Sequence, residues 1–215
     1  MTRSHSRALI IGLLLGCAAP VAAQNQASAA QQLSPSAQAR ADNGIMPYTD
    51  ADVHFMTGMI GHHAQAIVMA GWAPSHGASA SLKALCERVV VGQGDEIRIM
   101  QTWLRDRHLP VPEPDPRGMS MPGMPGHMML MPGMLTPEQM QQLDAARGVE
   151  FDRLFLTFMI QHHTGALTMV DELLGSTGAA QDLLIYKMAS DISADQTTEI
   201  NRMNLMLAAL PPGGR

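Results

Sequence analysis

Apolar residues recur along most of this chain at the three-to-four-residue spacing of an amphipathic α-helix. The four helices that this pattern predicts span about residues 50–71, 79–107, 137–174 and 179–210. Thr49 precedes the first helix as a capping residue, and Thr136 opens the third with Pro137 at the first helical position. Because no strand pattern competes with these helices, the sequence predicts an all-α fold.

Short loops join the first predicted helix to the second and the third to the fourth, so each pair must fold as an antiparallel hairpin. Two such hairpins make a four-helix bundle. Gly92 and Gly94 lie inside the second helix, where each costs about 1 kcal/mol relative to alanine. A local bend or the close approach of another helix would explain them, and both explanations stay open.

The chain repeats its most distinctive segment at an offset of 100 residues. Residues 55–70, FMTGMIGHHAQAIVMA, return at residues 155–170 as FLTFMIQHHTGALTMV. The second helix of each hairpin repeats as well, since the pattern QxxEIxxM at residues 93–100 matches residues 196–203. The sequence therefore predicts two similar halves, each with a His-His pair flanked by methionines.

Polar side chains share the apolar faces of these helices. Gln93 and Glu96 fall on the stripe of the second helix that also carries Met100, and His63 shares a stripe with Met59. The second half repeats this arrangement. Polar groups in a bundle core are costly unless they bond to one another or to a metal ion.

The residue types at these positions favour a soft metal ion. Imidazole and thioether groups bind copper, and Cu(I) above all, in preference to Mg, Ca or Mn. Carboxylate-bridged iron is less suited, because the Glu-x-x-His pairs that such bundles use are absent from the sequence. The predicted ligands on helices are His62, His63, Met59, Met69, Met100, His162, His163, Met159, Met169 and Met203. The predicted hydrogen-bond partners of these ligands are Asp52, Gln93, Glu96, Asp152, Gln196 and Glu199.

Each of these assignments has a plainer interpretation. A methionine stripe on a helix is commonly core packing, and Cys86 is interpreted as a small buried residue. Asp52 and Asp152 can serve only to stabilise helix starts, while Glu96 and Glu199 can bond a histidine or form solvated ion pairs. Only one histidine of each pair is expected to face a given groove, which leaves the other as a hydrogen-bond partner or a surface residue. Three further histidines without counterparts in the second half are expected at the surface, namely His54, His76 and His108.

A methionine-rich segment joins the two predicted hairpins. Seven of the sixteen residues at 119–134 are methionine, and the prolines and glycines among them exclude a regular helix. We expect an exposed loop over residues 117–134 whose thioethers wrap Cu(I) or Ag(I) without a preformed cavity. A merely flexible linker is the alternative. The predicted ligands in this loop are Met119, Met121, Met124, His127, Met128, Met131 and Met134.

Residues 1–23 have the features of an export signal, because Arg3 and Arg7 precede an apolar run that is followed by small residues. The apolar run is too short to span a membrane as a mature helix. A lipoprotein signal, with a lipid anchor at Cys17, is the alternative. In either case the mature protein is predicted to be periplasmic or otherwise exported.

At 215 residues the chain suits one compact domain or two small ones. Residues 24–45, rich in Ala, Gln and Ser, are expected to form a flexible leader before the bundle of residues 46–210. Removal of the signal takes away two of the 14 basic residues and leaves 12 against 19 acidic residues, a net charge of −7, which disfavours nucleic acid as a partner. Only Cys86 would remain, so no intramolecular disulfide is expected.

The duplicated motif F-x-x-x-M-I-x-H-H-x-x-A-x-x-M, followed by Q-x-x-E-I-x-x-M, resembles the family catalogued as domain of unknown function 305. The resemblance covers about residues 46–210 and implies a ferritin-like helical bundle. Some members of that family are periplasmic copper-binding proteins rich in Met and His that help cells survive excess copper. The resemblance thus implies metal roles for the four paired histidines and for Met59 and Met159. Gly61 and Gln161 depart from the pattern, because members often carry Pro there.

The sequence as a whole predicts an exported copper-binding protein that sequesters Cu(I) or hands it to a copper-handling partner protein. One alternative is a ferritin-like metal oxidase or another redox metalloenzyme. The other is an interaction module that grips partners through its methionine surface without a metal ion. No nucleotide motif, phosphate loop or nucleophile-base pair supports a different enzyme.

Overall fold

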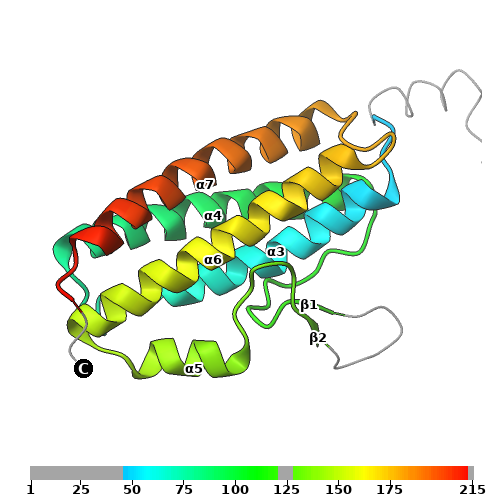
Figure 1. Ribbon diagram of the computed structural model, residues 1–215. Helices are drawn as coiled ribbons and strands as arrows, with labels where there is room; N and C mark the ends of the chain where they lie inside the picture. Colours follow the sequence, from blue (N-terminus) through cyan, green and yellow to red (C-terminus); the bar gives the residue numbers. More distant parts are fainter. Residues whose placement is uncertain (1–45, 121–127, 213–215) are drawn as a thin grey trace, which may run out of the picture. The chain divides into compact units, whose positions relative to one another are not determined.

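The computed structural model describes residues 46–120 and 128–212. They form helices and one short β-hairpin, which confirms the predicted all-α fold (Figure 1). None of these helices combines the length and apolar character needed to cross a lipid bilayer. The predicted signal and leader, residues 1–45, lie outside the described residues. In chain order the elements are α3 (Asp50–Gly71), α4 (Ala80–Asp106), β1 (Met119–Ser120), β2 (Met128–Met129), α5 (Pro137–Ala145), α6 (Gly148–Gly175) and α7 (Leu183–Ala209).

α3 and α4 begin at capping residues that the sequence predicted or implied. The Thr49 hydroxyl accepts a hydrogen bond from the Asp52 N–H, and the Asp52 carboxylate accepts in return from the Thr49 N–H at 2.7 Å. Ser79 caps α4 by accepting from the Leu82 N–H. The first predicted hairpin is therefore confirmed to within one residue at each helix end.

The third predicted helix was wrong as a single element, because the chain breaks between α5 and α6 at residues 146–147. Gly148 adopts a positive φ of 58°, and its N–H donates to the His76 carbonyl at 2.8 Å instead of to a preceding turn. A backbone in that region cannot continue a right-handed helix. The break lets α5 contact both α3 and α6.

α7 begins at Leu183, four residues later than predicted. Asp182 caps it by accepting from the Leu184 N–H at 2.8 Å. The same buried carboxylate accepts from the Trp103 indole N–H at 3.1 Å and pairs with Arg107 at the end of α4. These contacts of Asp182 fix the start of α7, so residues 179–182 belong to the loop between α6 and α7.

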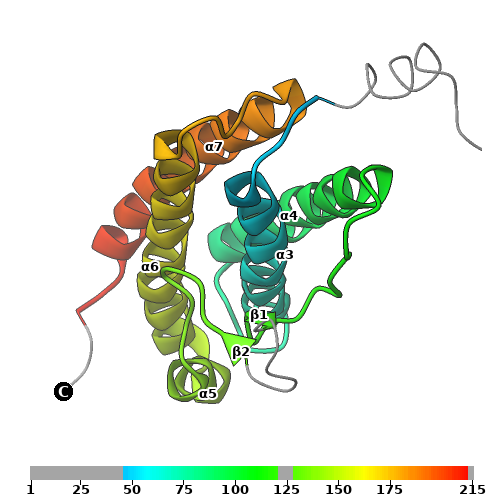
Figure 2. The same cartoon turned by 90° about the vertical axis from the view of Figure 1, so that its right-hand side faces the viewer.

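The helices form a ferritin-like antiparallel four-helix bundle of two hairpins. α3 packs along α4 and α6 along α7, and the two hairpins meet through α3 and α6. Figure 1 shows α7 and α4 on one side of this central pair, with α5 and the β1–β2 hairpin on the other, and Figure 2 shows the same arrangement from the side. In the β-hairpin, Met119 pairs with Met129 and Ser120 with Met128.

Apolar side chains fill two separate cores along the bundle. One combines the first half of α3 and the second half of α4 with the second half of α6 and the first half of α7. The other combines the complementary halves of the same helices. Because the residues between the two cores are polar and buried, a polar layer divides the bundle.

Buried aspartates tie each hairpin to the loop of the other. Asp52 of α3 accepts from the Ala180 N–H in the α6–α7 loop at 2.7 Å, and Asp152 of α6 accepts from the Ser79 N–H in the α3–α4 loop at 3.2 Å. Each aspartate precedes the first histidine of the His-His pair on its helix by ten residues, about 15 Å along the axis. The structure thus places both aspartates outside the polar layer, where they join the hairpins.

Candidate functional site

The polar layer is built by the duplicated motif. α3 and α6 each contribute a His-His pair, and all four of these side chains are fully buried (0 % exposed). α4 and α7 each contribute a glutamine and a glutamate from their QxxE segments. The polar layer consists of His62, His63, Gln93, Glu96, His162, His163, Gln196 and Glu199.

The four imidazole rings form one cluster at the centre of the bundle. The rings of His62 and His162 lie with their centroids 3.8 Å apart and their planes at 40°. The centroid of His63 is 6.2 Å from that of His62, and the centroid of His163 is 6.1 Å from that of His162. Within each pair, the first ring meets the other half of the bundle and the second meets a glutamate of its own hairpin. Neither histidine of a pair lies at the surface.

A glutamate contacts the cluster on each side. His163 Nε2 donates to Glu199 Oε2 at 2.7 Å, and His63 Nε2 lies 2.7 Å from Glu96 Oε2. The contact between His163 and Glu199 has the geometry of a hydrogen bond. The contact between His63 and Glu96 is equally short, but its angles are not those of a hydrogen bond. Both glutamate side chains are about one fifth exposed, 22 % for Glu96 and 21 % for Glu199, so they connect the buried rings to solvent.

Most ring nitrogens of the cluster have no hydrogen-bond partner among the described residues. His62 Nε2 lies 3.0 Å from the Pro132 carbonyl oxygen, which can only accept, so this nitrogen carries the proton. The lone pair on His62 Nδ1 is then free, and the bond to Glu199 leaves Nδ1 of His163 free in the same way. His162 has no partner within 46–120 and 128–212 at either nitrogen. Metal-binding histidines characteristically donate their other N–H to a carboxylate or carbonyl oxygen, as His62 and His163 do here.

Burial keeps the central pair of rings neutral. Removal from water, and secondarily the neighbouring His63, lower the pKa of His62 from 6.5 to about 3. Burial also lowers the pKa of His162 well below its ordinary value, and the adjacent His62 adds to this effect. A neutral imidazole is the form that binds a metal ion. Both rings are therefore ready for coordination at neutral pH.

A groove of about 350 Å³ opens between α4 and α7 beside the polar layer, and Glu96 and Glu199 line it. Gln93 and Gln196 also line it, although their side chains are buried, only 4 % and 3 % exposed. Neither amide has a partner for its oxygen or nitrogen in the part of the chain that the structure describes. Burial and the charges of the two glutamates raise the pKa of Asp195 in the same groove.

A loop segment, residues 130–135, covers the opposite side of the layer and is called the strap here. Gln65 anchors it, because its Oε1 accepts from the Leu135 N–H at 2.7 Å and its Nε2 donates to the Leu135 carbonyl at 3.1 Å. Gly165 leaves room for it, since a Cβ there would overlap the Pro132 carbonyl. Gln65 was not among the residues predicted from the sequence. The available signal was its polar side chain on an otherwise apolar stretch of the helix.

The predicted methionine ligands on helices flank the layer in the two cores. Met59, Met100 and Met169 lie in one core, and Met69, Met159 and Met203 lie in the other. All six are buried. The structure thus brings thioethers to both sides of the histidines, in positions that also suit plain core packing.

The expectation of an exposed loop was wrong for Met131 and Met134, which are each only 5 % exposed. The strap carries both into the first core, where the Met131 side chain packs over Gly58 beside Met169. Met119 and Met128 are half-buried in the β-hairpin. Three predicted loop ligands lie outside the described residues, namely Met121, Met124 and His127.

The donor set fits a soft ion better than a metal held by nitrogen and oxygen alone. Among the described residues, no three His, Cys, Asp or Glu side chains are grouped so as to hold a metal ion by themselves. An ion in the layer would use the free imidazole nitrogens and draw on neighbouring thioethers, a mixture that Cu(I) accepts. Burial raises the pKa of Cys86 to about 12, so this thiol supplies no thiolate.

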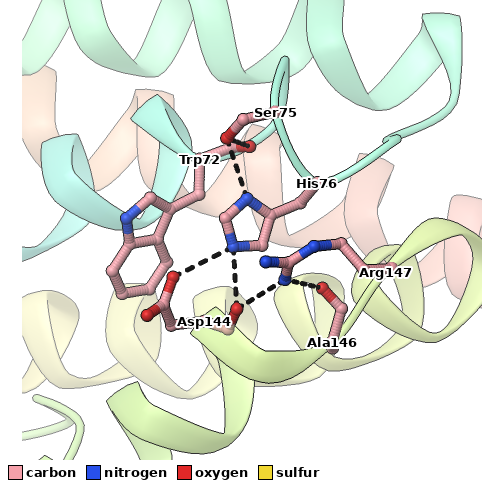
Figure 3. Close-up of polar contacts among 6 residues, drawn as sticks. All are labelled: Trp72, Ser75, His76, Asp144, Ala146 and Arg147. Atoms are coloured by element: carbon pink, nitrogen blue, oxygen red, sulfur yellow. Dashed lines mark hydrogen bonds and ion pairs between the residues drawn. The ribbon is translucent and has the colours of Figure 1, made fainter.

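His76 shows what a satisfied buried histidine looks like in the same molecule (Figure 3). Its Nδ1 lies 2.9 Å from Ser75 Oγ, and its Nε2 lies 3.0 Å from Asp144 Oδ1. The ring stacks on Trp72 with centroids 5.8 Å apart. The expectation that His76 lies at the surface was wrong, because it is 5 % exposed and links the α3–α4 loop to α5. The other two histidines expected at the surface, His54 and His108, are exposed.

Several solved proteins share this fold, and the similarity extends over nearly the full length of each of them. A DUF305 protein from Streptomyces coelicolor, described as secreted, is 25 % identical with a TM-score of 0.62, over 77 % of this chain and 98 % of that one. A DUF305 fragment from Deinococcus radiodurans is 27 % identical with a TM-score of 0.62, over 77 % of this chain and 100 % of that one.

CopM in its Cu(I)-bound form is 28 % identical with a TM-score of 0.56, over 75 % of this chain and 97 % of that one. CopM has also been solved in Cu(II)-bound, Ag-bound and apo forms. No protein with a curated description matches the chain. The model of the domain of unknown function DUF305 matches residues 52–207, which include both His-His motifs. This chain therefore belongs to the DUF305 family.

Proposed function

We propose that this protein binds copper as Cu(I) in the polar layer, and that it sequesters the ion or hands it to a partner protein outside the cytoplasm. The observation that carries the proposal is the set of wholly buried imidazole nitrogens without hydrogen-bond partners among the described residues. Leaving a buried polar atom unpaired costs about 1–3 kcal/mol. Coordination of a metal ion would offset that cost several times over.

His62 and His162 are the central ligands in this proposal, because their rings are adjacent and His62 Nδ1 is free. His63 and His163 stand beside them, with their Nε2 atoms directed at Glu96 and Glu199. These carboxylates would orient the rings and strengthen them as donors. The flanking methionines would supply sulfur ligands, which favour the +1 state of copper.

Similarity to two solved proteins also supports the proposal. CopM, which shares this fold at 28 % identity, has been solved with Cu(I) bound. The Streptomyces coelicolor relative is described as secreted, which agrees with the signal features of residues 1–23 in this chain. A lipid anchor at Cys17 remains the alternative form of export.

The direct test is an anaerobic competition titration of Cu(I) between the protein and a chromophoric chelator. The double variant His62→Ala/His162→Ala should lose at least about 100-fold in affinity, because it removes ligands and not only their supports. A matched control, His54→Ala/His108→Ala, removes the same number of histidines from exposed positions and should bind like the wild type. Equal affinities for the wild type and the first variant would refute the site.

The same titration separates the layer from the methionine-rich loop. Because Met131 and Met134 belong to the core, deletion of the whole loop would damage the fold, so the loop variant should change only Met121, Met124 and His127. We expect this variant to lose less affinity than the layer variant. X-ray absorption of the copper-loaded protein should show both nitrogen and sulfur neighbours, and a shell of oxygen alone would contradict the proposal even if a variant failed to fold.

A further inference from the structure

The groove between α4 and α7 is the second polar feature of the bundle, and the metal proposal above does not account for it. Its volume is about 350 Å³. Equivalent residues of the two halves line it, Gln93 and Glu96 from α4 and Gln196 and Glu199 from α7. Arg88 and Arg202 also line the groove and are exposed.

The two glutamines indicate that the groove receives a ligand. Both side chains are more than nine-tenths buried, and none of their four amide atoms has a hydrogen-bond partner among the described residues. A buried amide without partners is destabilising, and an apolar residue of similar size would remove the cost. The duplication of Gln93 as Gln196 places two such amides at one groove. Amide groups both donate and accept, so they suit a ligand with its own shell of water molecules.

The two glutamates connect the groove to the histidine cluster. Each lines the groove, is about one fifth exposed, and has a carboxylate oxygen 2.7 Å from a fully buried imidazole nitrogen. Asp195 adds a third carboxylate to the same groove. These three carboxylates outnumber the two guanidinium groups of Arg88 and Arg202, so the charges that line the groove favour a further cation.

The opposite side of the cluster is closed by backbone. The strap lies directly on His62, whose Nε2 meets the Pro132 carbonyl at 3.0 Å. Gly61 of α3 lies against the loop, where a Cβ would come within 2.7 Å of the Gly118 carbonyl oxygen. Gly165 of α6 has no room for a Cβ beside the strap. An ion arriving from this side would have to displace the strap, whereas the groove side presents carboxylates.

We propose that the groove between α4 and α7 is the entrance through which a copper ion that carries labile ligands, such as water or acetonitrile, reaches the histidine cluster. This inference rests on the proposed function. The ion exchanges bound water first for a carboxylate oxygen of Glu96 or Glu199 and then for the free imidazole Nδ1 of His63 or His163, so that no proton has to leave a ring. The water is released into the groove, where Gln93 and Gln196 hydrogen-bond to the remaining shell, and the oxidation state of copper does not change.

Gly92 makes the entrance testable without touching a proposed ligand. It lies in α4 on the groove, and a Cβ built there meets nothing within 4 Å. The close helix approach that could have explained this glycine is therefore absent. Gly92→Phe should fill the groove without straining the backbone. Gly94→Phe is a matched control, because Gly94 belongs to the same helix and does not line the groove.

The rate of loading is the quantity to measure. Protein is mixed anaerobically with Cu(I) as its acetonitrile complex, and after set delays an excess of chromophoric chelator reports the copper not yet captured. Gly92→Phe should load at least about tenfold more slowly than the wild type but reach the same stoichiometry, while Gly94→Phe should load at the wild-type rate. If the Gly92→Phe variant takes up copper at the wild-type rate, the proposed entrance is wrong. Ser120 lines a pocket on the β-hairpin side. If Ser120→Phe were the only one of these variants to load copper slowly, the proposed entrance would also be wrong.

A second variant keeps the inference open to test if Gly92→Phe fails to fold. Glu96→Gln/Glu199→Gln preserves side-chain size but removes both charges, and it should slow loading more than it lowers final occupancy. Equal effects on rate and occupancy would make the glutamates supports of the histidines and not part of an entrance. If the wild type itself captures no copper, the proposed function fails. If it captures copper and no groove variant changes the rate, only the entrance fails.

Discussion

The two halves of the bundle carry the same histidine motif but differ on the face that meets the strap. α3 has Gly61 and Gln65, whereas at the equivalent positions α6 has Gln161 and Gly165. Each glycine lets loop backbone lie against its helix, and each glutamine bonds to the strap. The exchange of Gly and Gln shows that a duplicated pair of helices has kept a symmetric interior while its outer face has become specific for one asymmetric loop.

This difference reaches the histidine cluster. His62 has its Nε2 fixed by the Pro132 carbonyl of the strap, while the equivalent His162 has no partner at either nitrogen among the described residues. The strap therefore selects the tautomer of one ring only. If the layer binds copper as proposed, His62 is the ring whose donor atom is set in advance, whereas no hydrogen bond among the described residues sets the tautomer of His162.

The largest effect should come from adding a methyl group where the strap crosses α6. Gly165→Ala would place a Cβ against the Pro132 carbonyl and the Gly133 Cα, both backbone atoms that cannot move independently. We expect a loss of roughly 3 kcal/mol in the free energy of unfolding, measured by urea denaturation. Gly92→Ala is the control, because its Cβ has open space, and it should be neutral or stabilising by up to about 1 kcal/mol. Similar midpoints for both variants would contradict the close approach of the strap.

Much of the fold could be predicted from local signals. Thr49 and Ser79 begin α3 and α4 as capping residues, and the repeat fixed the two-hairpin bundle. The helical period also placed His63 and Glu96 each on the apolar stripe of its own helix, but it did not pair them, and the structure brings their side chains within 2.7 Å. Helix caps and helical stripes depend on residues a few positions apart, and the repeat is visible by direct comparison of two segments, which is why the sequence alone predicts them. The metal roles of these residues stay predictions.

The features that the sequence did not reveal depend on contacts between distant residues. The burial of Met131 requires space beside Gly58, and the seat of the strap requires Gly165. Neither glycine is marked by a local pattern as a contact point. The break before α6 likewise depends on the bond from the Gly148 N–H to the His76 carbonyl, across more than 70 residues. Proline and glycine content correctly excluded a helix in the described parts of the loop, residues 117–120 and 128–134, but could not tell which methionines fold inward.

A smaller effect is expected on the free energy of unfolding when Gln65 and Gln161, which both bond to the strap, are replaced one at a time. Gln65→Ala would leave the buried N–H and carbonyl of Leu135 without their partner, at an expected cost of about 2–3 kcal/mol. Gln161→Ala removes an exposed hydrogen bond to the Gly133 carbonyl and should cost less than about 1 kcal/mol. Urea denaturation of both variants measures the difference. Equal losses would show that the strap is held symmetrically, against the contacts described here.

The smallest predicted effect is the loss of stability that protonation of His62 causes in acid. The pKa of His62 is about 3 in the folded protein and 6.5 when the ring is in water, so between these values the unfolded chain binds a proton that the folded chain does not. The contribution of His62 to the stability of the metal-free protein is therefore fully present above pH 6.5 and is lost as the pH falls toward 3. At pH 5 the His62 contribution to this loss is about 2 kcal/mol, since one pKa unit corresponds to about 1.4 kcal/mol.

Substitution of this one ring tests that assignment. His62→Gln keeps an N–H donor for the Pro132 carbonyl but cannot be protonated in this range, so its stability should fall by about 2 kcal/mol less than the wild type between pH 7 and pH 5. His54→Gln removes an exposed ring that is solvated in both states, and its stability curve should parallel the wild type. Urea midpoints at a series of pH values give the three curves. A His62→Gln curve parallel to the wild type would mean that water reaches the cluster in the metal-free protein, and the same water would then be the first ligand that an arriving copper ion displaces.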